Sequence, residues 1–156
     1  MGHGIPVASS TAERRCSVTG QCSILYINTE SVIDTHASAL RALGFDVLEV
    51  NDVPVRDTLA KHHAIIVRLK RGRQLPSVAA RLRAAPLFGR RVLIALVPAS
   101  VTVRERREAV DCGFNLVLPE RCSARDLAAA ILTLLRRYPE HRCILRSHTQ
   151  RRRAAA

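Results

Sequence analysis

Five short runs of mainly aliphatic residues recur along the chain, and their spacing constrains the fold more than any other feature. They occupy residues 24–27, 45–50, 64–67, 92–97 and 115–118. The first, third and fourth runs are continuously apolar, which is the pattern of strands buried on both faces of a sheet. Because such strands need cover on both sides, the pattern favours a parallel sheet with helices packed on each face.

Helical patterns fill the intervals between these runs. We expect helices over residues 32–43, 54–61, 77–84, 102–110 and 123–138. Gly44 is suited to end the first helix in the left-handed conformation, and Thr102 and Ser123 are suited to cap the last two. Strand and helix therefore alternate five times, which predicts a flavodoxin-like (βα)5 α/β fold with strand order 2-1-3-4-5 and right-handed crossovers.

The chain divides into one domain with two tails. Residues 1–22 are small and polar and predict a flexible leader, residues 23–138 form the domain, and residues 139–156 form a basic C-terminal tail. No apolar run is long enough to span a membrane, and the first residues lack the pattern of a secretory signal. The five cysteines have no metal-site spacing. We therefore expect a cytoplasmic protein.

Three stretches carry short motifs in a characteristic order: residues 24–29, 43–47 and 109–119. In that order and at those separations they resemble receiver domains of bacterial response regulators, over about residues 23–137. The resemblance implies regulation in two-component (phosphorelay) signal transduction. It also implies recognition through the face built by the fourth helix, fifth strand and fifth helix, and a cis peptide bond before Pro119.

The phosphoryl-transfer chemistry of that family needs specific residues at the carboxyl ends of the strands. These are two Mg²⁺-binding carboxylates, an acceptor Asp, a Ser or Thr and a Lys. The matched positions here carry Asn28, Thr29, Arg68, Val97 and Leu118. A guanidinium stays protonated and has no nucleophilic oxygen, and neutral side chains bind Mg²⁺ poorly. We therefore expect a degenerate, non-phosphorylatable pseudo-receiver that is a binding module and not an enzyme, with no cofactor and no Mg²⁺ site.

Other residues near this degenerate pocket have competing interpretations. Glu30 could pair with Arg68. A second possibility is a small anion bound by Arg68 and the basic residues that follow it, Lys70, Arg71 and Arg73, against the alternative of a solvated loop. His62 and His63 are adjacent, so they cannot both face one site from a regular element. His36 lies on the apolar stripe of the first helix and is expected to be a packed core residue.

The last helix suggests a surface for a partner. It is apolar along one stripe at Leu127, Ile131 and Leu134 and along a second at Ala128, Leu132 and Leu135. A helix that is apolar on two sides needs a second partner, although exposed leucines are also common. The candidate interaction face comprises Arg104, Arg106, Arg107, Asn115, Leu132 and Leu135. We expect a stand-alone adaptor or regulator that binds a signalling protein or a second copy of itself.

The charge of the chain supports one alternative function. Lysine and arginine number 25 against 13 acidic residues, a net charge of +12. Seven arginines lie in the last part of the chain: Arg136, Arg137, Arg142, Arg146, Arg151, Arg152 and Arg153. They could bind nucleic acid or another polyanion, with an affinity that falls steeply with salt. No aromatic residues for base stacking are interleaved with them, and a solvated basic tail is the competing interpretation.

Overall fold

The computed structural model describes most of the expected domain and part of the expected tail. The described residues are 21–30, 34–54, 61–70, 75–83, 91–138, 141, 148–150 and 153–156. Residues 1–20 of the expected leader and nearly all of the helix expected over residues 54–61 lie outside them.

The core of the molecule is a sheet of five parallel strands. They are β1 (Ser23–Asn28), β2 (Asp46–Val50), β3 (Ala64–Arg68), β4 (Val92–Val97) and β5 (Leu116–Pro119). Their order is β2-β1-β3-β4-β5, which confirms the predicted fold and topology. β1, β3 and β4 are the continuously apolar runs of the sequence, and they occupy the three inner positions because only there are both strand faces covered.

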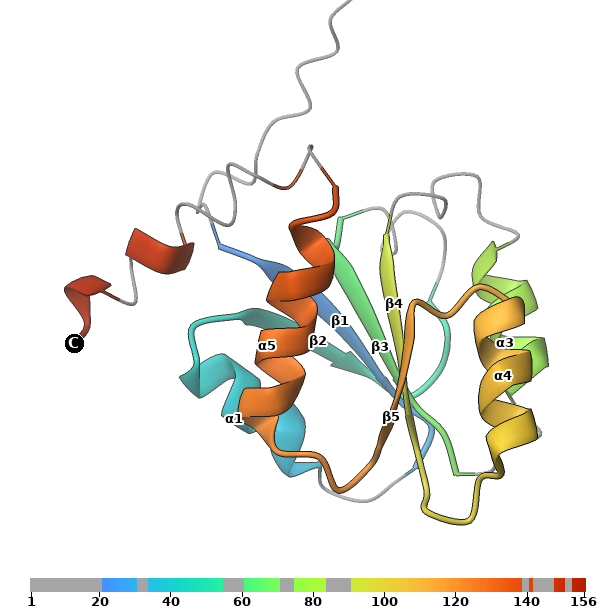
Figure 1. Cartoon of the computed structure of the whole chain (residues 1–156). Helices are drawn as coiled ribbons and strands as arrows, with labels where there is room; N and C mark the ends of the chain where they lie inside the picture. Colours follow the sequence, from blue (N-terminus) through green and yellow to red (C-terminus); the bar gives the residue numbers. More distant parts are fainter. Residues whose placement is uncertain are drawn as a thin grey trace, which may run out of the picture.

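In the described part of the chain, four helices cover the two faces of the sheet (Figure 1). α1 (Thr35–Ala42) and α5 (Ala124–Leu135) lie on one face, and α3 (Leu75–Arg83) and α4 (Val103–Asp111) lie on the other. α1 begins three residues later than the sequence pattern predicts, because Asp34 is extended and caps the helix. α5 ends at Leu135, three residues earlier than predicted.

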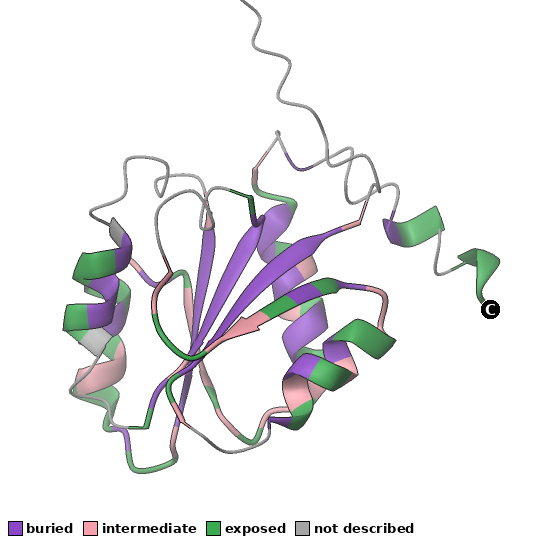
Figure 2. Ribbon diagram, turned by 180° about the vertical axis from the view of Figure 1, so that it is seen from behind, coloured by how far each residue is buried: buried purple, intermediate pink, exposed green. Residues whose placement is uncertain are grey.

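Side chains alternate between two separate hydrophobic layers, and the inner strands are buried except at Arg68, the last residue of β3 (Figure 2). Ile24 and Tyr26 of β1 face the layer under α1 and α5, whereas Leu25 and Ile27 face the layer under α3 and α4. This alternation follows from the two-residue period of a strand. Each large aliphatic side chain that is fully buried contributes about 1.5–3 kcal/mol to folding.

The predicted helix boundaries that depend on local chemistry are confirmed. Gly44 and Gly113 follow α1 and α4 with φ angles of 92° and 108°, a conformation that favours glycine. Thr102 and Glu105 form a capping box at the start of α4. The Ser123 hydroxyl accepts a hydrogen bond from the Asp126 amide at the start of α5.

The peptide bond before Pro119 is trans, so the expectation of a cis bond was wrong. Pro119 continues β5 in register with Val97, and the amide of Glu120 donates to the Val97 carbonyl at 2.8 Å. The chain therefore runs on as strand at the position where the resemblance implied a cis bond. A trans bond is also the intrinsic preference before proline, by about 0.5–1 kcal/mol.

Candidate functional site

The candidate site lies at the carboxyl ends of the strands, where α/β sheets of this topology bind their ligands. Asn28 ends β1 and Arg68 ends β3, and the two are direct partners in the sheet register. Thr29 follows β1, and its hydroxyl donates a hydrogen bond to the Arg68 carbonyl at 2.8 Å. Three of the five positions matched to the phosphoryl-transfer pocket therefore meet at this edge.

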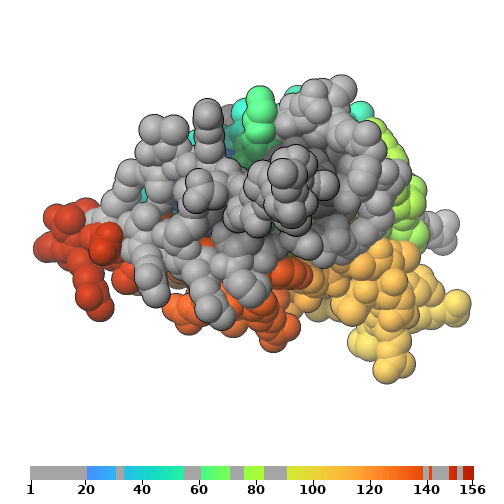
Figure 3. All heavy atoms as spheres, turned by 90° about the horizontal axis from the view of Figure 1, so that it is seen from above, coloured from blue at the N-terminus to red at the C-terminus, as the bar shows by residue number. Residues whose placement is uncertain are grey.

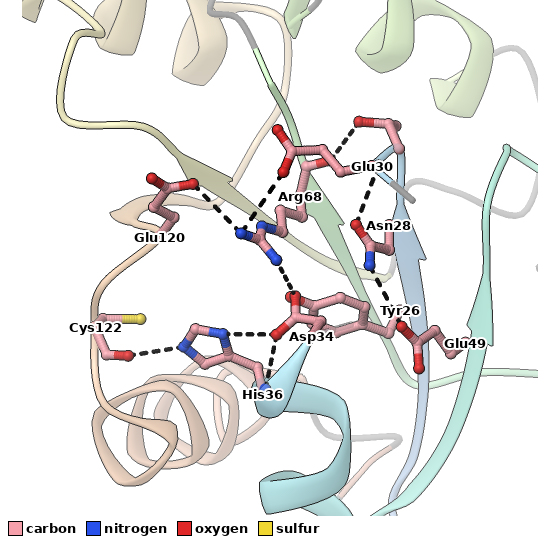
Figure 4. A network of polar contacts seen from close by, with 10 residues as sticks. Tyr26, Asn28, Glu30, Asp34, His36, Glu49, Arg68, Glu120 and Cys122 are labelled. Atoms are coloured by element: carbon pink, nitrogen blue, oxygen red, sulfur yellow. Dashed lines mark hydrogen bonds and ion pairs between the residues drawn. The ribbon is translucent and has the colours of Figure 1, made fainter. Parts of the chain in front are cut away.

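The guanidinium of Arg68 occupies the centre of this edge and faces three carboxylates (Figure 4). Its Nη1 lies 3.0 Å from Asp34 Oδ2, and its Nη2 lies 3.7 Å from Glu30 Oε2 and from Glu120 Oε2. The Glu30 pairing expected from the sequence is present. The carboxylates come from three different elements: the turn after β1, the cap of α1 and the turn after β5. One guanidinium thus links the ends of β1, β3 and β5 to the start of α1.

Asp34 is the most buried charged group of the site, with 1 % of its side chain exposed. Its Oδ2 accepts hydrogen bonds from the Tyr26 hydroxyl and from Arg68, and its Oδ1 accepts one from the His36 amide at 2.7 Å. Burial alone would raise the pKa of Asp34. The hydrogen bonds from Tyr26 and His36 and the charge of Arg68 outweigh burial and hold that pKa below its ordinary value.

The two partners of Asp34 on the strands are fixed in their protonated forms. Burial, together with the hydrogen bond to Asp34 and the charge of that carboxylate, raises the pKa of the Tyr26 phenol, so Tyr26 acts as a hydrogen-bond donor. Burial opposes the charge of Arg68, but Asp34 more than compensates, and the pKa of Arg68 is raised. The centre of the site is therefore a carboxylate held by a neutral phenol and a guanidinium.

His36 extends this network to the loop before α5. Its Nδ1 lies 3.1 Å from Asp34 Oδ1, and its Nε2 lies 2.8 Å from the carbonyl oxygen of Cys122. His36 is packed, with 12 % of its side chain exposed, and its ring also bridges two polar groups at the surface of the core. The network ties the start of α1 to the segment that connects β5 and α5.

Asn28 orders the turn after β1, since its Oδ1 accepts from the Glu30 amide at 3.2 Å and its Nδ2 donates to Glu49 at 3.4 Å. The two remaining matched positions contribute no polar side chain to the site. Val97 is fully buried in the layer under α3 and α4. Leu118 packs, partly buried, against the layer under α1 and α5.

This arrangement limits the chemistry that the site can perform. The guanidinium and its three carboxylates carry a net charge of two negative, and Arg68 offers no nucleophilic oxygen. The small-anion hypothesis loses its central group, because Arg68 is already paired, and Arg71 and Arg73 lie outside the described residues. Among the described residues, no three His, Cys, Asp or Glu side chains are grouped to hold a metal ion.

The expected interaction face is only partly at the surface. Arg107 is exposed, Arg106 is half-buried, and Arg104 is exposed and pairs with Glu108 at 2.9 Å. Asn115 is exposed, and its Oδ1 accepts from the Leu93 amide at 2.7 Å. The structure therefore places four polar residues of the predicted face at or near the surface.

The two leucines of that face require a correction. Leu135 is fully buried, and Leu132 packs partly buried against the same core. The second apolar stripe of α5 belongs to the layer that also contains Ala37 and Leu40 of α1, so the fold itself supplies the second partner. Leu135 was wrongly assigned to a docking surface. The large exposed hydrophobic residues of α4 are Val103 and Val110.

The basic candidates near the C-terminus divide into two groups. Arg136, Arg137 and Arg153 are exposed, whereas Arg142, Arg146, Arg151 and Arg152 lie outside the described residues. Two residues of the expected tail, His141 and His148, are buried, with 3 % of each exposed. This part of the tail packs against the domain.

Sequence reasoning missed most of the polar network. Asp34, Tyr26, Glu120 and Glu49 were not proposed as site residues. One signal could have identified Asp34: an Asp directly before the first residues of a helix is a preferred N-cap, and the start of a helix lies at this edge of the sheet. Tyr26 carries a weaker signal, since a hydroxyl inside a continuously apolar strand must find a partner.

Comparisons with known proteins identify the fold. No protein-family model and no curated protein matches the sequence. A protein of Burkholderia pseudomallei described as pilus assembly-related has a similar structure, with a TM-score of 0.62, 15 % identity, and coverage of 77 % of this chain and 93 % of its own. An orphan response regulator of H. pylori follows, with a TM-score of 0.58, 19 % identity, and coverage of 74 % and 98 %.

A third similar structure is that of an atypical orphan response regulator, described as having a new phosphorylation-independent regulatory mechanism. It has a TM-score of 0.58, 20 % identity, and coverage of 73 % of this chain and 95 % of its own. Together with the sheet order, these similarities show that the chain has the receiver fold of response regulators. None of the helices in the described part of the chain combines the length and apolarity required to cross a membrane.

Proposed function

We propose that this chain is a receiver-fold regulatory module of bacterial signal transduction that recognises a protein partner and works without phosphorylation. The observation that carries this proposal is the position of Arg68. It stands at the end of β3, where receivers of the resembling family carry the acceptor aspartate, and its guanidinium is held 3.0 Å from the buried Asp34.

The network around Arg68 favours a single arrangement of this edge. In a phosphorylatable receiver, the charge at the carboxyl edge changes when a phosphoryl group and a metal ion arrive. Here the cation is the side chain of Arg68, which is permanently charged and pairs with Asp34, Glu30 and Glu120. An incoming phosphate would meet two uncompensated negative charges and would have to displace a buried ion pair. A constitutive signalling state is the simplest function for such a site.

The face around α4 is the surface that we assign to the partner. Val103 is 84 % exposed and Val110 is 51 % exposed at the two ends of α4, and Arg104 and Arg107 lie exposed between them. Apolar contacts next to exposed arginines fit a partner that presents an apolar patch beside acidic residues. The similarity to orphan and atypical response regulators supports a regulatory role.

Nuclear magnetic resonance tests the proposed loss of phosphoryl chemistry. We expect the backbone amide signals of Asn28, Thr29 and Arg68 to stay in place when Mg²⁺ and beryllofluoride, a mimic of the phosphoryl group, are added. Arg68→Asp, which restores an acceptor carboxylate, is the matched variant. Saturable shifts of these signals in the unaltered protein would contradict the proposal.

Site-specific photo-crosslinking in cells tests the proposed partner face. A crosslinker at Val103 is expected to trap a defined protein, and the adduct should disappear when Arg104 and Arg107 are both changed to Glu. A crosslinker at Leu48, exposed on the edge strand β2, is the matched control position. Equal amounts of adduct from the Val103 and Leu48 positions would count against this face. So would an adduct from Val103 that persists when Arg104 and Arg107 are changed to Glu.

Polyanion binding is the alternative function. Arg136 and Arg137 are exposed at the end of α5, and Arg153 is exposed near the C-terminus. Fluorescence anisotropy with labelled duplex DNA at low and physiological salt tests this alternative. Changing Arg151, Arg152 and Arg153 to Ser is preferable to truncation at Tyr138, because truncation would also remove the buried His141 and His148. Binding at physiological salt that is lost in this variant would favour the polyanion function.

A further inference from the structure

Strand β2 forms one edge of the sheet, away from the face that we assign to the partner. In the strand order of the described residues, β2 and β5 are the two outermost strands. Figure 3 shows α4 and α5, yellow to orange, along one side of the molecule, and the blue-green atoms of the β2 region on the opposite side. An edge strand presents backbone amides and carbonyls that can pair with a strand of another chain.

The backbone groups of β2 divide into an inner and an outer set. The Asp46 amide donates to the Cys22 carbonyl at 3.0 Å, so the backbone of Asp46 faces β1. Because successive residues of a strand turn their backbone groups to opposite sides, Leu48 also faces β1, whereas Val47 and Glu49 face outward. The outer edge of β2 therefore consists of the amides and carbonyls of Val47 and Glu49.

The side chain of Arg41 covers part of this outer edge. Arg41 lies in the last turn of α1, and its Nε and Nη2 donate to the Val47 carbonyl at 3.2 Å and 3.0 Å. A carbonyl oxygen has two lone pairs, so this double contact uses its full accepting capacity. The guanidinium thus occupies one of the two carbonyls to which an added strand would bind.

The middle residue of β2 is an exposed leucine. Leu48 is 43 % exposed, although the residue before it, Val47, is buried. The side chain of Leu48 lies on the sheet face covered by α3 and α4, because its register partner Leu25 belongs to that layer. A second strand beside β2 would cover this side chain.

A second copy of β2 fits this edge in one register. In an antiparallel pair centred on Leu48, the two Leu48 side chains face each other, Val47 lies opposite Glu49, and Asp46 lies opposite Val50. No like charges are then directly opposite. A pair centred on Glu49 would oppose two carboxylates, and a pair centred on Val47 would place Leu48 opposite Asp46.

We propose that the outer edge of β2 is a pairing surface for a second copy of this chain, centred on Leu48, and that Arg41 keeps this surface closed. In the register above, Val47 of each copy exchanges two hydrogen bonds with Glu49 of the other. Half of these bonds end on the Val47 carbonyls that Arg41 occupies. Pairing therefore requires the removal of both Arg41 side chains from the edge.

Sedimentation equilibrium of the full chain and of Arg41→Ala tests the closing role. Removing Arg41 frees two acceptors for hydrogen bonds across the pair, which corresponds to a dissociation constant about five- to hundredfold lower. Arg104→Ala is the matched control, because it removes an exposed positive charge from α4 and leaves β2 unchanged. A dissociation constant that is the same for Arg41→Ala and the unaltered chain would overturn the proposal.

Disulfide crosslinking tests the register. Directly opposite residues of this kind have Cα atoms about 4.5 Å apart, which permits a disulfide. In the Arg41→Ala chain, Leu48→Cys is expected to give a dimer joined at position 48 under mild oxidation, with the joined peptides mapped by mass spectrometry. Asp46→Cys is the control, because position 46 lies opposite Val50 and should not join to its own copy.

Two crosslinking results would contradict the proposal: equal dimer from positions 46 and 48, and dimer at position 48 that does not increase when Arg41 is removed. Leu48→Lys in the Arg41→Ala chain places two like charges opposite each other and is expected to restore the dissociation constant of the unaltered chain. Because none of these variants alters Val103, Arg104 or Arg107, the result is independent of the partner face on α4.

Discussion

Replacing Asp34 with alanine is the perturbation that probes the polar network most sharply. The side chain is 1 % exposed, pairs with Arg68 at 3.0 Å and accepts hydrogen bonds from the Tyr26 hydroxyl and the His36 amide. Loss of the helix cap costs about 1 kcal/mol. Breaking a buried ion pair by removing one partner costs about 3–5 kcal/mol, and Glu30 and Glu120 remain at 3.7 Å to offset part of this.

We therefore expect Asp34→Ala to lower the free energy of unfolding by roughly 3–5 kcal/mol, measured by urea denaturation at pH 7.5. Asp34→Asn keeps a capping oxygen and should cost less. Arg104→Ala is the matched control, because it removes the exposed i,i+4 pair with Glu108 and should cost at most about 0.5 kcal/mol. A loss below about 1 kcal/mol for Asp34→Ala would refute the network as the organiser of this edge.

Three further predictions concern stability. Between pH 7.5 and pH 4.5 the free energy of unfolding should fall by up to roughly 2–3 kcal/mol because of His63, whose pKa is depressed in the folded state, and urea titrations of His63→Asn should show a flatter pH profile. Leu135→Ala should cost about 2–5 kcal/mol and Leu132→Ala clearly less, since only Leu135 is fully buried; equal losses in thermal denaturation would contradict this. Gly44→Ala should lower the melting temperature, at a cost of about 1 kcal/mol or more, because its φ of 92° is strained for any other residue.

The features that the sequence predicted are those that depend on residues close together in the chain, within one strand or at one helix end. β1, β3 and β4 stand out because a strand buried on both faces must be continuously apolar. Gly44, Thr102 and Ser123 mark helix ends because each meets a backbone requirement within a few residues. Alternation of these elements then leaves few possible topologies.

The features that it did not predict depend on tertiary contacts. Asp34 is 34 positions from Arg68 in sequence, and only the register of β1 and β3 brings the two together. The two-sided apolarity of α5 left open a separate partner or ordinary exposed leucines, whereas α1 packs against the second stripe, and no local pattern distinguishes these cases. The bond before Pro119 was inferred from resemblance alone, and the chain departs from the family at the neighbouring Leu118.

Intact-mass spectrometry after incubation with acetyl phosphate and Mg²⁺ tests the central claim most directly, with a phosphorylatable receiver as the positive control in the same reaction. We predict that the control gains one phosphoryl group and that this chain gains none, because Arg68 occupies the acceptor position. A phosphoryl group on this chain that maps to Asp34, Glu30 or any other carboxylate of the carboxyl edge would contradict the account.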